Sequence, residues 1–138
     1  MPHLVILYTP NLDAETDMST LCRALADTML TVHDEAGRPV FPTGGVRVLA
    51  YPAAHSAVAD GQRDYAFAYL NLRMGRGRSD AVKRRAGEQL AAAARAHFAP
   101  VLATRHVGIT LQIDEGPEVF DAKLGNLHPL FATTTTKA

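Results

Sequence analysis

The pattern of apolar and polar positions divides the chain into two blocks. In each block, a pattern typical of a strand is followed by one typical of a helix and then by a second strand pattern. In the first block, the apolar run at residues 4–8 is too short for a helix and ends in turn residues, so it predicts a buried strand. From Asp13, the predicted N-cap, the apolar period becomes that of an amphipathic helix. A loop at 34–45, rich in glycine and proline, then leads to a strand at 46–51. The helical stripe consists of Met18, Leu21, Cys22, Leu25, Met29 and Val32.

The second block repeats this order. Residues 64–74 predict a long strand, a turn at 75–79 follows it, and Ser79 is the predicted N-cap of a second helix. At 107–113, apolar residues alternate with polar or small ones, which is typical of a half-buried strand. The apolar stripe of the second helix consists of Val82, Ala86, Leu90, Ala93, Ala94, His97, Phe98 and Val101.

The two blocks have equal internal spacing. Leu4 and Val46 are 42 positions apart, and so are Tyr65 and Val107. This spacing indicates a tandem repeat of a strand–helix–strand unit, although the two halves share little residue identity. We therefore predict an α+β domain of two βαβ units, in which right-handed crossovers place both helices on one face of a four-stranded sheet. The domain is expected to span residues 1–132, with a low-complexity, disordered tail at 133–138.

Two helices leave the second face of such a sheet uncovered. The strand residues are too apolar for both faces to lie in water, so we expect another copy of the chain to cover the open face. The residues on which this expectation rests are Phe67, Tyr69, Val107, Ile109 and Leu111.

Composition narrows the classes of protein that remain. The 138 residues carry 14 Lys and Arg against 14 Asp and Glu, so no overall charge draws the protein to nucleic acid or to anionic membranes. The single cysteine, Cys22, excludes an intramolecular disulfide, and no apolar run approaches the length of a membrane span. The N-terminus lacks the basic segment of a signal peptide, so a soluble cytoplasmic protein is expected.

Pro2 is the first residue with a possible chemical role. Taken alone, a proline at this position carries no meaning, because chain termini tolerate most residues. However, aminopeptidases remove Met1 when the next residue is small, and the apolar run that begins at Leu4 would fix the new terminus to a strand end. Burial and nearby cations would lower the pKa of the proline amine below its ordinary value of about 7.7–8.0. Pro2 would then be a neutral secondary amine able to accept a proton.

A group of arginines suggests the ligand. The helix-start residues 83–85 (KRR) are typical of a solvated helix face, and the basic segment as a whole lacks the aromatic residues that RNA binding would need. Arg78 differs, because it lies in a turn that leads into a helix start, where backbone amides and a guanidinium together favour an anion. Arg47 is an isolated charge in an apolar strand. Two arginines and a terminal amine suit a small substrate with carboxylates.

Other candidate residues are weaker. The six histidines show no metal-binding spacing, and neither a dinucleotide nor a P-loop motif is present, so no cofactor and no metal are expected. His97 and Cys22 fall on helix stripes, where a core position is the more common explanation.

Taken together, these segments resemble the 5-carboxymethyl-2-hydroxymuconate isomerase family of the tautomerase superfamily, over nearly the whole chain. The loop at 31–43 is longer than the usual connection of that family and leads directly to Arg47, and the residues after Phe131 are an extension. The matching segments are 1–3 (MPH), 45–47 (GVR), 60–67 (DGQRDYAF), 72–79 (LRMGRGRS), 86–88 (AGE) and 126–131 (NLHPLF).

The resemblance implies both an assembly and a reaction. It implies a homotrimer of two-βαβ subunits that isomerises 5-carboxymethyl-2-hydroxymuconate, a dienol, to its oxo tautomer in homoprotocatechuate (4-hydroxyphenylacetate) breakdown without a cofactor. It also implies that Pro2 moves the proton and that Arg47 and Arg78 hold the carboxylates of the substrate. Two alternatives remain open: a related tautomerase of another dienol, and a non-catalytic trimer that binds carboxylates.

Overall fold

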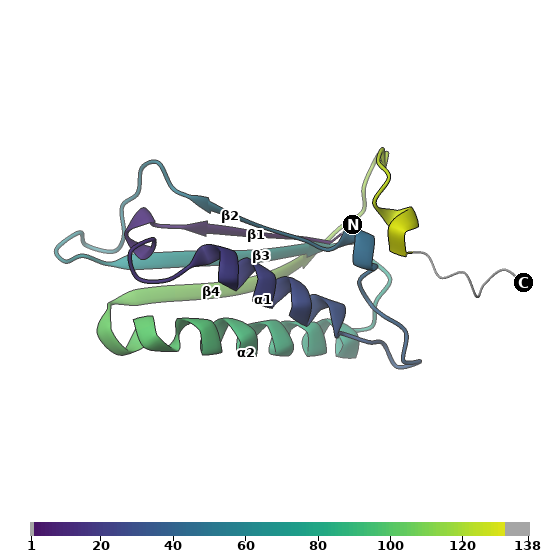
Figure 1. The fold of residues 1–138 in the computed structure, drawn as a ribbon, viewed down its shortest axis with the longest axis horizontal. Coiled ribbons are helices and arrows are strands. Elements are labelled where there is room, and N and C mark those ends of the chain that lie inside the picture. The colour runs from purple at the N-terminus through teal and green to yellow at the C-terminus, as the bar shows by residue number, and fades with distance from the viewer. Residues whose placement is uncertain (1, 132–138) are drawn as a thin grey trace, which may run out of the picture.

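The computed structural model describes residues 2–131, which form a four-stranded sheet and two α-helices (Figure 1). Met1 and the predicted tail at 133–138 lie outside the described residues. The strands are β1 (His3–Tyr8), β2 (Arg47–Pro52), β3 (Ala66–Met74) and β4 (Val107–Glu115), and the helices are α1 (Met18–Leu30) and α2 (Asp80–Thr104).

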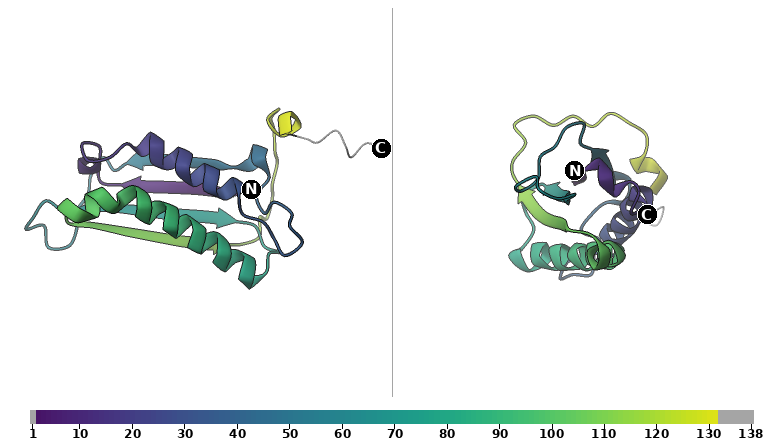
Figure 2. Two further views of the ribbon diagram at one scale, coloured as in Figure 1. Left: turned by 60° about the horizontal axis from the view of Figure 1, so that its bottom comes forward. Right: turned by 90° about the vertical axis from the view of Figure 1, so that its left-hand side faces the viewer.

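The sheet has the strand order β2-β1-β3-β4. The outer pairs, β1 with β2 and β3 with β4, are parallel, whereas the central pair of β1 and β3 is antiparallel. Each parallel pair is joined through a helix, and α1 and α2 lie on the same face of the sheet (Figures 1 and 2). The predicted architecture of two βαβ units is therefore confirmed.

The hydrophobic core lies between the sheet and the two helices. Every second residue of β1 and β3 points into it, which is the period that strands impose on a half-buried sheet. Leu70 at the centre of β3 and Phe98 on α2 are fully buried. The predicted stripe of α2 is confirmed at its buried residues, whereas Ala93 and His97 are only partly buried. The buried residues are Val82, Ala86, Leu90, Ala94, Phe98 and Val101.

The first helix begins later than predicted. Its N-cap is Asp17, whose side chain accepts a hydrogen bond from the backbone N–H of Ser19, and not Asp13. Asp13 instead accepts a hydrogen bond of 2.8 Å from the hydroxyl of Tyr8 and lies directly after a 3₁₀ turn, Pro10–Leu12. For the second helix, the predicted cap is correct, because Ser79 accepts a hydrogen bond from the N–H of Val82.

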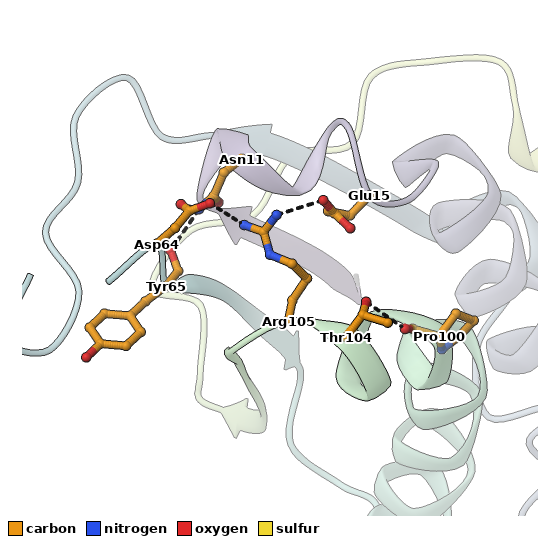
Figure 3. Close-up of polar contacts among 7 residues, drawn as sticks. All are labelled: Asn11, Glu15, Asp64, Tyr65, Pro100, Thr104 and Arg105. Atoms are coloured by element: carbon orange, nitrogen blue, oxygen red, sulfur yellow. Dashed lines mark hydrogen bonds and ion pairs between the residues drawn. The ribbon is translucent and has the colours of Figure 1, made fainter. Parts of the chain in front are cut away.

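A polar network closes the end of the sheet where β3 begins (Figure 3). The guanidinium of Arg105 donates to a carboxylate oxygen of Glu15 and to one of Asp64, both at 2.7 Å. Asn11 donates to Asp64 and to the backbone carbonyl of Tyr65. The Asp64 carboxylate and the Tyr65 carbonyl thus have their partners in this network and not in the sheet. The strand β3 begins at Ala66 and not at the predicted Asp64.

The face of the sheet away from the helices is partly apolar. Leu7, Leu49 and Tyr51 are about half exposed there. The prediction of a half-buried strand is confirmed for β4, but its apolar residues do not support the expectation of a covered open face. Val107, Ile109, Leu111 and Ile113 pack against the core on the helix side. Because successive side chains of a strand point to opposite faces, the open face carries the alternate residues Gly108, Thr110, Gln112 and Asp114. No helix within residues 2–131 has the length and apolar character needed to span a membrane.

Candidate active site

Strand register brings the three predicted site residues to one end of the sheet. His3 is the register partner of Arg47 on one side and of Arg73 on the other. Pro2, which is buried, therefore lies where β2 begins and where β3 ends. The turn between β3 and α2 lies at this same end of the sheet (Figure 1). Arg78 belongs to this turn.

The connection between α1 and β2, residues 31–46, is a folded segment that we call the β2 loop. Its tip is a tight turn in which Asp34 accepts hydrogen bonds from the backbone N–H groups of Ala36 and Arg38. Behind the tip, an isolated bridge pairs residues 33 and 39, and the N–H of Val40 donates to the carbonyl of residue 32 at 2.9 Å. Val40 and Phe41 are buried and anchor the loop in the core.

Arg78 is held by the β2 loop. One amino group of its guanidinium, Nη2, donates to the carbonyl oxygen of Val40 at 2.9 Å, and Nη1 donates to the carbonyl of Gly75 at 3.3 Å. The guanidinium carbon lies 6.0 Å from the ring centroid of Phe41, at the outer limit of a cation–π contact. These contacts fix the plane of the guanidinium and leave other N–H donors for a ligand.

Arg47 is held by the same loop. Its Nη1 donates to the carbonyl oxygen of Gly44 at 3.0 Å. Gly44 belongs to a 3₁₀ turn, Thr43–Gly45 (η2), and a Cβ atom at Gly44 would lie only 3.0 Å from the Cα of His128. A C-terminal 3₁₀ turn, His128–Phe131 (η3), thus packs directly on the segment that positions Arg47.

Within the described part of the chain, no carboxylate neutralises the charges of these two arginines. Within residues 2–131, neither Arg47 nor Arg78 has a carboxylate within ion-pair distance, and their hydrogen-bond acceptors are neutral backbone carbonyls. Arg105 at the opposite end is paired with two carboxylates. Two partly buried cations without counter-ions make the Pro2 end of the sheet attractive to an anion.

His3 lies beside the site on β1. Partial burial and the nearby positive charge of Arg47 lower the pKa of its imidazole. His3 is therefore neutral at pH 7 and adds no positive charge to those of the arginines.

The remaining candidates have structural partners. His97 makes a hydrogen bond of 2.7 Å with the hydroxyl of Thr16, and burial raises the pKa of the half-buried Cys22 thiol, which disfavours the nucleophilic thiolate. Lys83 pairs with Asp80 and Glu115. Among the residues that the structure describes, no group of three or more His, Cys, Asp or Glu side chains is arranged to hold a metal ion.

Sequence reasoning missed the groups that hold the arginines. The acceptors are the backbone carbonyls of Val40 and Gly44, and every residue type has such a carbonyl, so the sequence carries no signal for them. Phe41 left a weak signal as an apolar residue inside a loop rich in glycine and proline. A buried aromatic residue in such a loop indicates an anchor.

Comparison with known proteins gives the family. The family model described as 5-carboxymethyl-2-hydroxymuconate isomerase matches residues 2–131. The chain belongs to this family. The 5-carboxymethyl-2-hydroxymuconate Delta-isomerase of Escherichia coli is 30% identical over 131 residues, which cover 95% of this chain and 99% of the relative. The predicted resemblance is thus confirmed, and the protein is an isomerase.

Solved structures of the family agree with the fold. A crystal structure of a 5-carboxymethyl-2-hydroxymuconate delta-isomerase is 65% identical, has a TM-score of 0.93, and covers 96% of this chain and 94% of its own. A 5-carboxymethyl-2-hydroxymuconate isomerase from Deinococcus radiodurans R1 is 35% identical, with a TM-score of 0.84 and coverage of 96% and 95%. The family fold therefore includes both βαβ units and the end of the sheet at which Pro2, Arg47 and Arg78 lie.

Proposed function

We propose that this protein converts 5-carboxymethyl-2-hydroxymuconate, a dienol, into its oxo tautomer in the breakdown of homoprotocatechuate (4-hydroxyphenylacetate). The observation that carries the proposal is a pair of arginines, Arg47 and Arg78, at the same end of the sheet as Pro2, for which residues 2–131 supply no counter-ion. The names of the relatives support the substrate, since both the E. coli protein and the structure at 65% identity are named for this isomerisation.

Pro2 is the proposed general base. Once Met1 is removed, its nitrogen is a secondary amine with an ordinary pKa of about 7.7–8.0. The buried position of Pro2 and the positive charge of Arg47 near the same strand end both favour the neutral amine. The amine accepts the proton of the enol hydroxyl and returns a proton to a carbon of the conjugated chain, which leaves the ketone.

The arginines hold the carboxylates and stabilise the negative charge that develops on the enol oxygen. Arg78 is the stronger candidate for this second role, because its guanidinium is already fixed by two carbonyls and needs little reorganisation. The reaction moves only a proton, so the proposal requires neither a metal nor an organic cofactor.

We also propose that the protein acts as a homotrimer. The open face of the sheet carries the half-exposed Leu7, Leu49 and Tyr51. Beyond β4, the segment that leads to η3 is apolar and almost completely solvent-exposed at Val119 and Leu124. A second copy of the chain is the occupant that would cover both surfaces. Sedimentation equilibrium tests this proposal, and a monomer at micromolar concentration would contradict it.

The activity itself is tested with tag-free protein whose mass shows that Met1 is absent. The decay of dienol ultraviolet absorbance is followed for the carboxymethyl compound and for 2-hydroxymuconate without that group. We expect fast decay, with a preference for the carboxymethyl compound. A preference for the other dienol would favour a related tautomerase, and no acceleration over buffer would favour the carboxylate-binding alternative.

A further inference from the structure

Two contacts fasten the β2 loop to the beginning of α2. The hydroxyl of Ser79 donates to a carboxylate oxygen of Glu35 at 2.6 Å, and the guanidinium of Arg85 donates to the backbone carbonyl of His33, also at 2.6 Å. Both donors follow Arg78 in the sequence, and both acceptors lie near the tip of the loop. The loop is therefore attached to the element that carries Arg78 at points beyond the arginine itself.

The attachment reaches the carbonyl that holds Arg78. Glu35 lies within the Asp34 turn, and the N–H of Asp34 donates to the carbonyl of Arg38 at 2.8 Å. From there the chain passes directly to Val40, whose carbonyl accepts the hydrogen bond from Arg78 at 2.9 Å. Because the turn is closed by its own hydrogen bonds, Glu35 and the Val40 carbonyl belong to one hydrogen-bonded segment, in which Val40 is fixed by the core and Glu35 by Ser79.

We propose that Glu35 is a positioning residue for Arg78, acting through the β2 loop, and that it thereby sets the affinity of the site for the carboxylates of the substrate. The inference deepens the proposed isomerase function and rests on it for its kinetic consequence. The Glu35 carboxylate accepts from Ser79, whereas the Arg78 guanidinium donates to Gly75 and Val40. It holds the loop so that the N–H donors of Arg78 not used by Val40 and Gly75 keep a fixed direction.

The electrostatic state of Glu35 suits this role. The hydrogen bond from Ser79 and the positive charge of Arg85 lower the pKa of the Glu35 carboxyl, so the carboxylate is ionised at neutral pH. An ionised carboxyl offers only acceptor atoms, so the Ser79 hydroxyl donates to it. Ser79 meanwhile accepts a hydrogen bond from Val82 as the cap of α2, so its hydroxyl is oriented from both sides.

The kinetic test is a double-mutant cycle on the full-length isomerase. Glu35→Ala should raise KM for the carboxymethyl dienol about tenfold with a smaller change in kcat, because a charged hydrogen bond is lost one step away from the substrate contact. Glu35→Gln keeps an oxygen that accepts from Ser79 and should restore most of the affinity. Glu88→Ala, an exposed glutamate on α2, is the matched control and should change neither constant.

The cycle is completed with Arg78→Ala and the double variant. If Glu35 acts through Arg78, adding Glu35→Ala to Arg78→Ala should cost no further activity. Additive losses in the double variant would overturn the proposal, because they would mean that Glu35 acts independently of the arginine. A Glu35→Gln variant as weak as Glu35→Ala would also overturn it.

A spectroscopic readout separates this inference from the proposed activity. In a ¹⁵N–¹H spectrum of the arginine side chains, the Nε–H peak that disappears in Arg78→Lys belongs to Arg78. We expect Glu35→Ala to shift or broaden this peak, whereas Glu35→Gln and Glu88→Ala leave it in place. A peak that does not respond to Glu35→Ala contradicts the positioning role. A responding peak in a protein that turns over no dienol would support the positioning and contradict the proposed function.

Discussion

The guanidinium of Arg78 donates a hydrogen bond of 2.9 Å to the backbone carbonyl of Val40, although 38 positions separate the two residues in the sequence. A carbonyl acceptor orients the arginine without cancelling its charge, whereas a carboxylate would do both. Arg47 is held in the same manner by Gly44. The loop before β2 therefore supplies orientation to both arginines and leaves their attraction for anions intact.

Replacing Arg78 should weaken both binding and turnover. In the proposed function, Arg78 is a charged donor whose contact with the substrate strengthens as charge develops. For Arg78→Ala we therefore expect KM to rise and kcat to fall, each by about tenfold or more. Steady-state kinetics with the carboxymethyl dienol measure both constants. Arg84→Ala, an exposed arginine on α2, serves as the control. If Arg78→Ala left both constants unchanged, the carboxylate assignment would be wrong.

Pro2→Ala should leave the fold intact and reduce turnover by a factor of about 10² or more. The variant replaces a secondary amine by a primary one of different basicity, and alanine is also small enough for Met1 to be removed. Mass spectrometry establishes the terminus, circular dichroism the fold, and the dienol assay the rate. Wild-type turnover in this variant would exclude Pro2 as the base.

The network around Arg105 should affect stability and not catalysis. Arg105→Ala removes hydrogen bonds to Glu15 and Asp64, and for such partly exposed pairs we expect a loss of about 1 kcal/mol in the free energy of unfolding. Urea unfolding measures the loss, and kcat and KM of the folded variant should equal those of the wild type. A changed KM would mean that the two ends of the sheet are coupled.

The environment of Tyr8 should make its phenol titrate at unusually high pH. Burial, together with its hydrogen bond to Asp13, raises the pKa of the Tyr8 phenol to about 12. Since the pKa of an unfolded tyrosine is about 10, the stabilising contribution of Tyr8 is complete below that pH and is lost as the pH rises toward the folded value. Phenolate absorbance should therefore show a late-titrating tyrosine. This phase should be missing in Tyr8→Phe, and its persistence there would assign it to another residue.

Core packing between α2 and the sheet is tested at Phe98. This side chain is fully buried, so Phe98→Ala should lower the free energy of unfolding by about 3–5 kcal/mol. Leu102, on the same helix but about half exposed, is the matched control and should lose much less on truncation. Thermal unfolding of both variants gives the comparison. Equal losses would mean that the exposed face of α2 is covered in the assembled protein.

The sequence predicted the fold because the signals for strands and helices are local. The period-two run of β3 and the stripe of α2 are visible within a few turns of chain, and Ser79 stands directly before its helix. Asp13 was misassigned as a cap because it has the right chemistry, and only the fold shows that Tyr8 uses its carboxylate. The orientation of β4 was likewise ambiguous. The alternation of apolar and polar residues separates its side chains into two faces but does not show which face packs against the helices.

The candidate site was predictable only in part. Pro2, Arg47 and Arg78 are unusual residue types in their local contexts, so they could be identified as candidates one by one. Their common position at one end of the sheet follows from strand register, which depends on pairing between distant segments. The acceptors at Val40 and Gly44 are backbone atoms, and contacts of this kind between a loop and a distant side chain leave no pattern in the sequence.

Because β1 and β3 are antiparallel, the two βαβ units run in opposite directions, and one unit begins at each end of the sheet. At the end where β3 starts, Arg105 forms ion pairs with Glu15 and Asp64, so two carboxylates of the chain itself neutralise this arginine (Figure 3). At the end where β1 starts, Arg47 and Arg78 donate to neutral backbone carbonyls. In one half of this duplicated architecture the arginine is thus neutralised by the chain's own carboxylates, whereas in the other half, within residues 2–131, Arg47 and Arg78 keep their full charge.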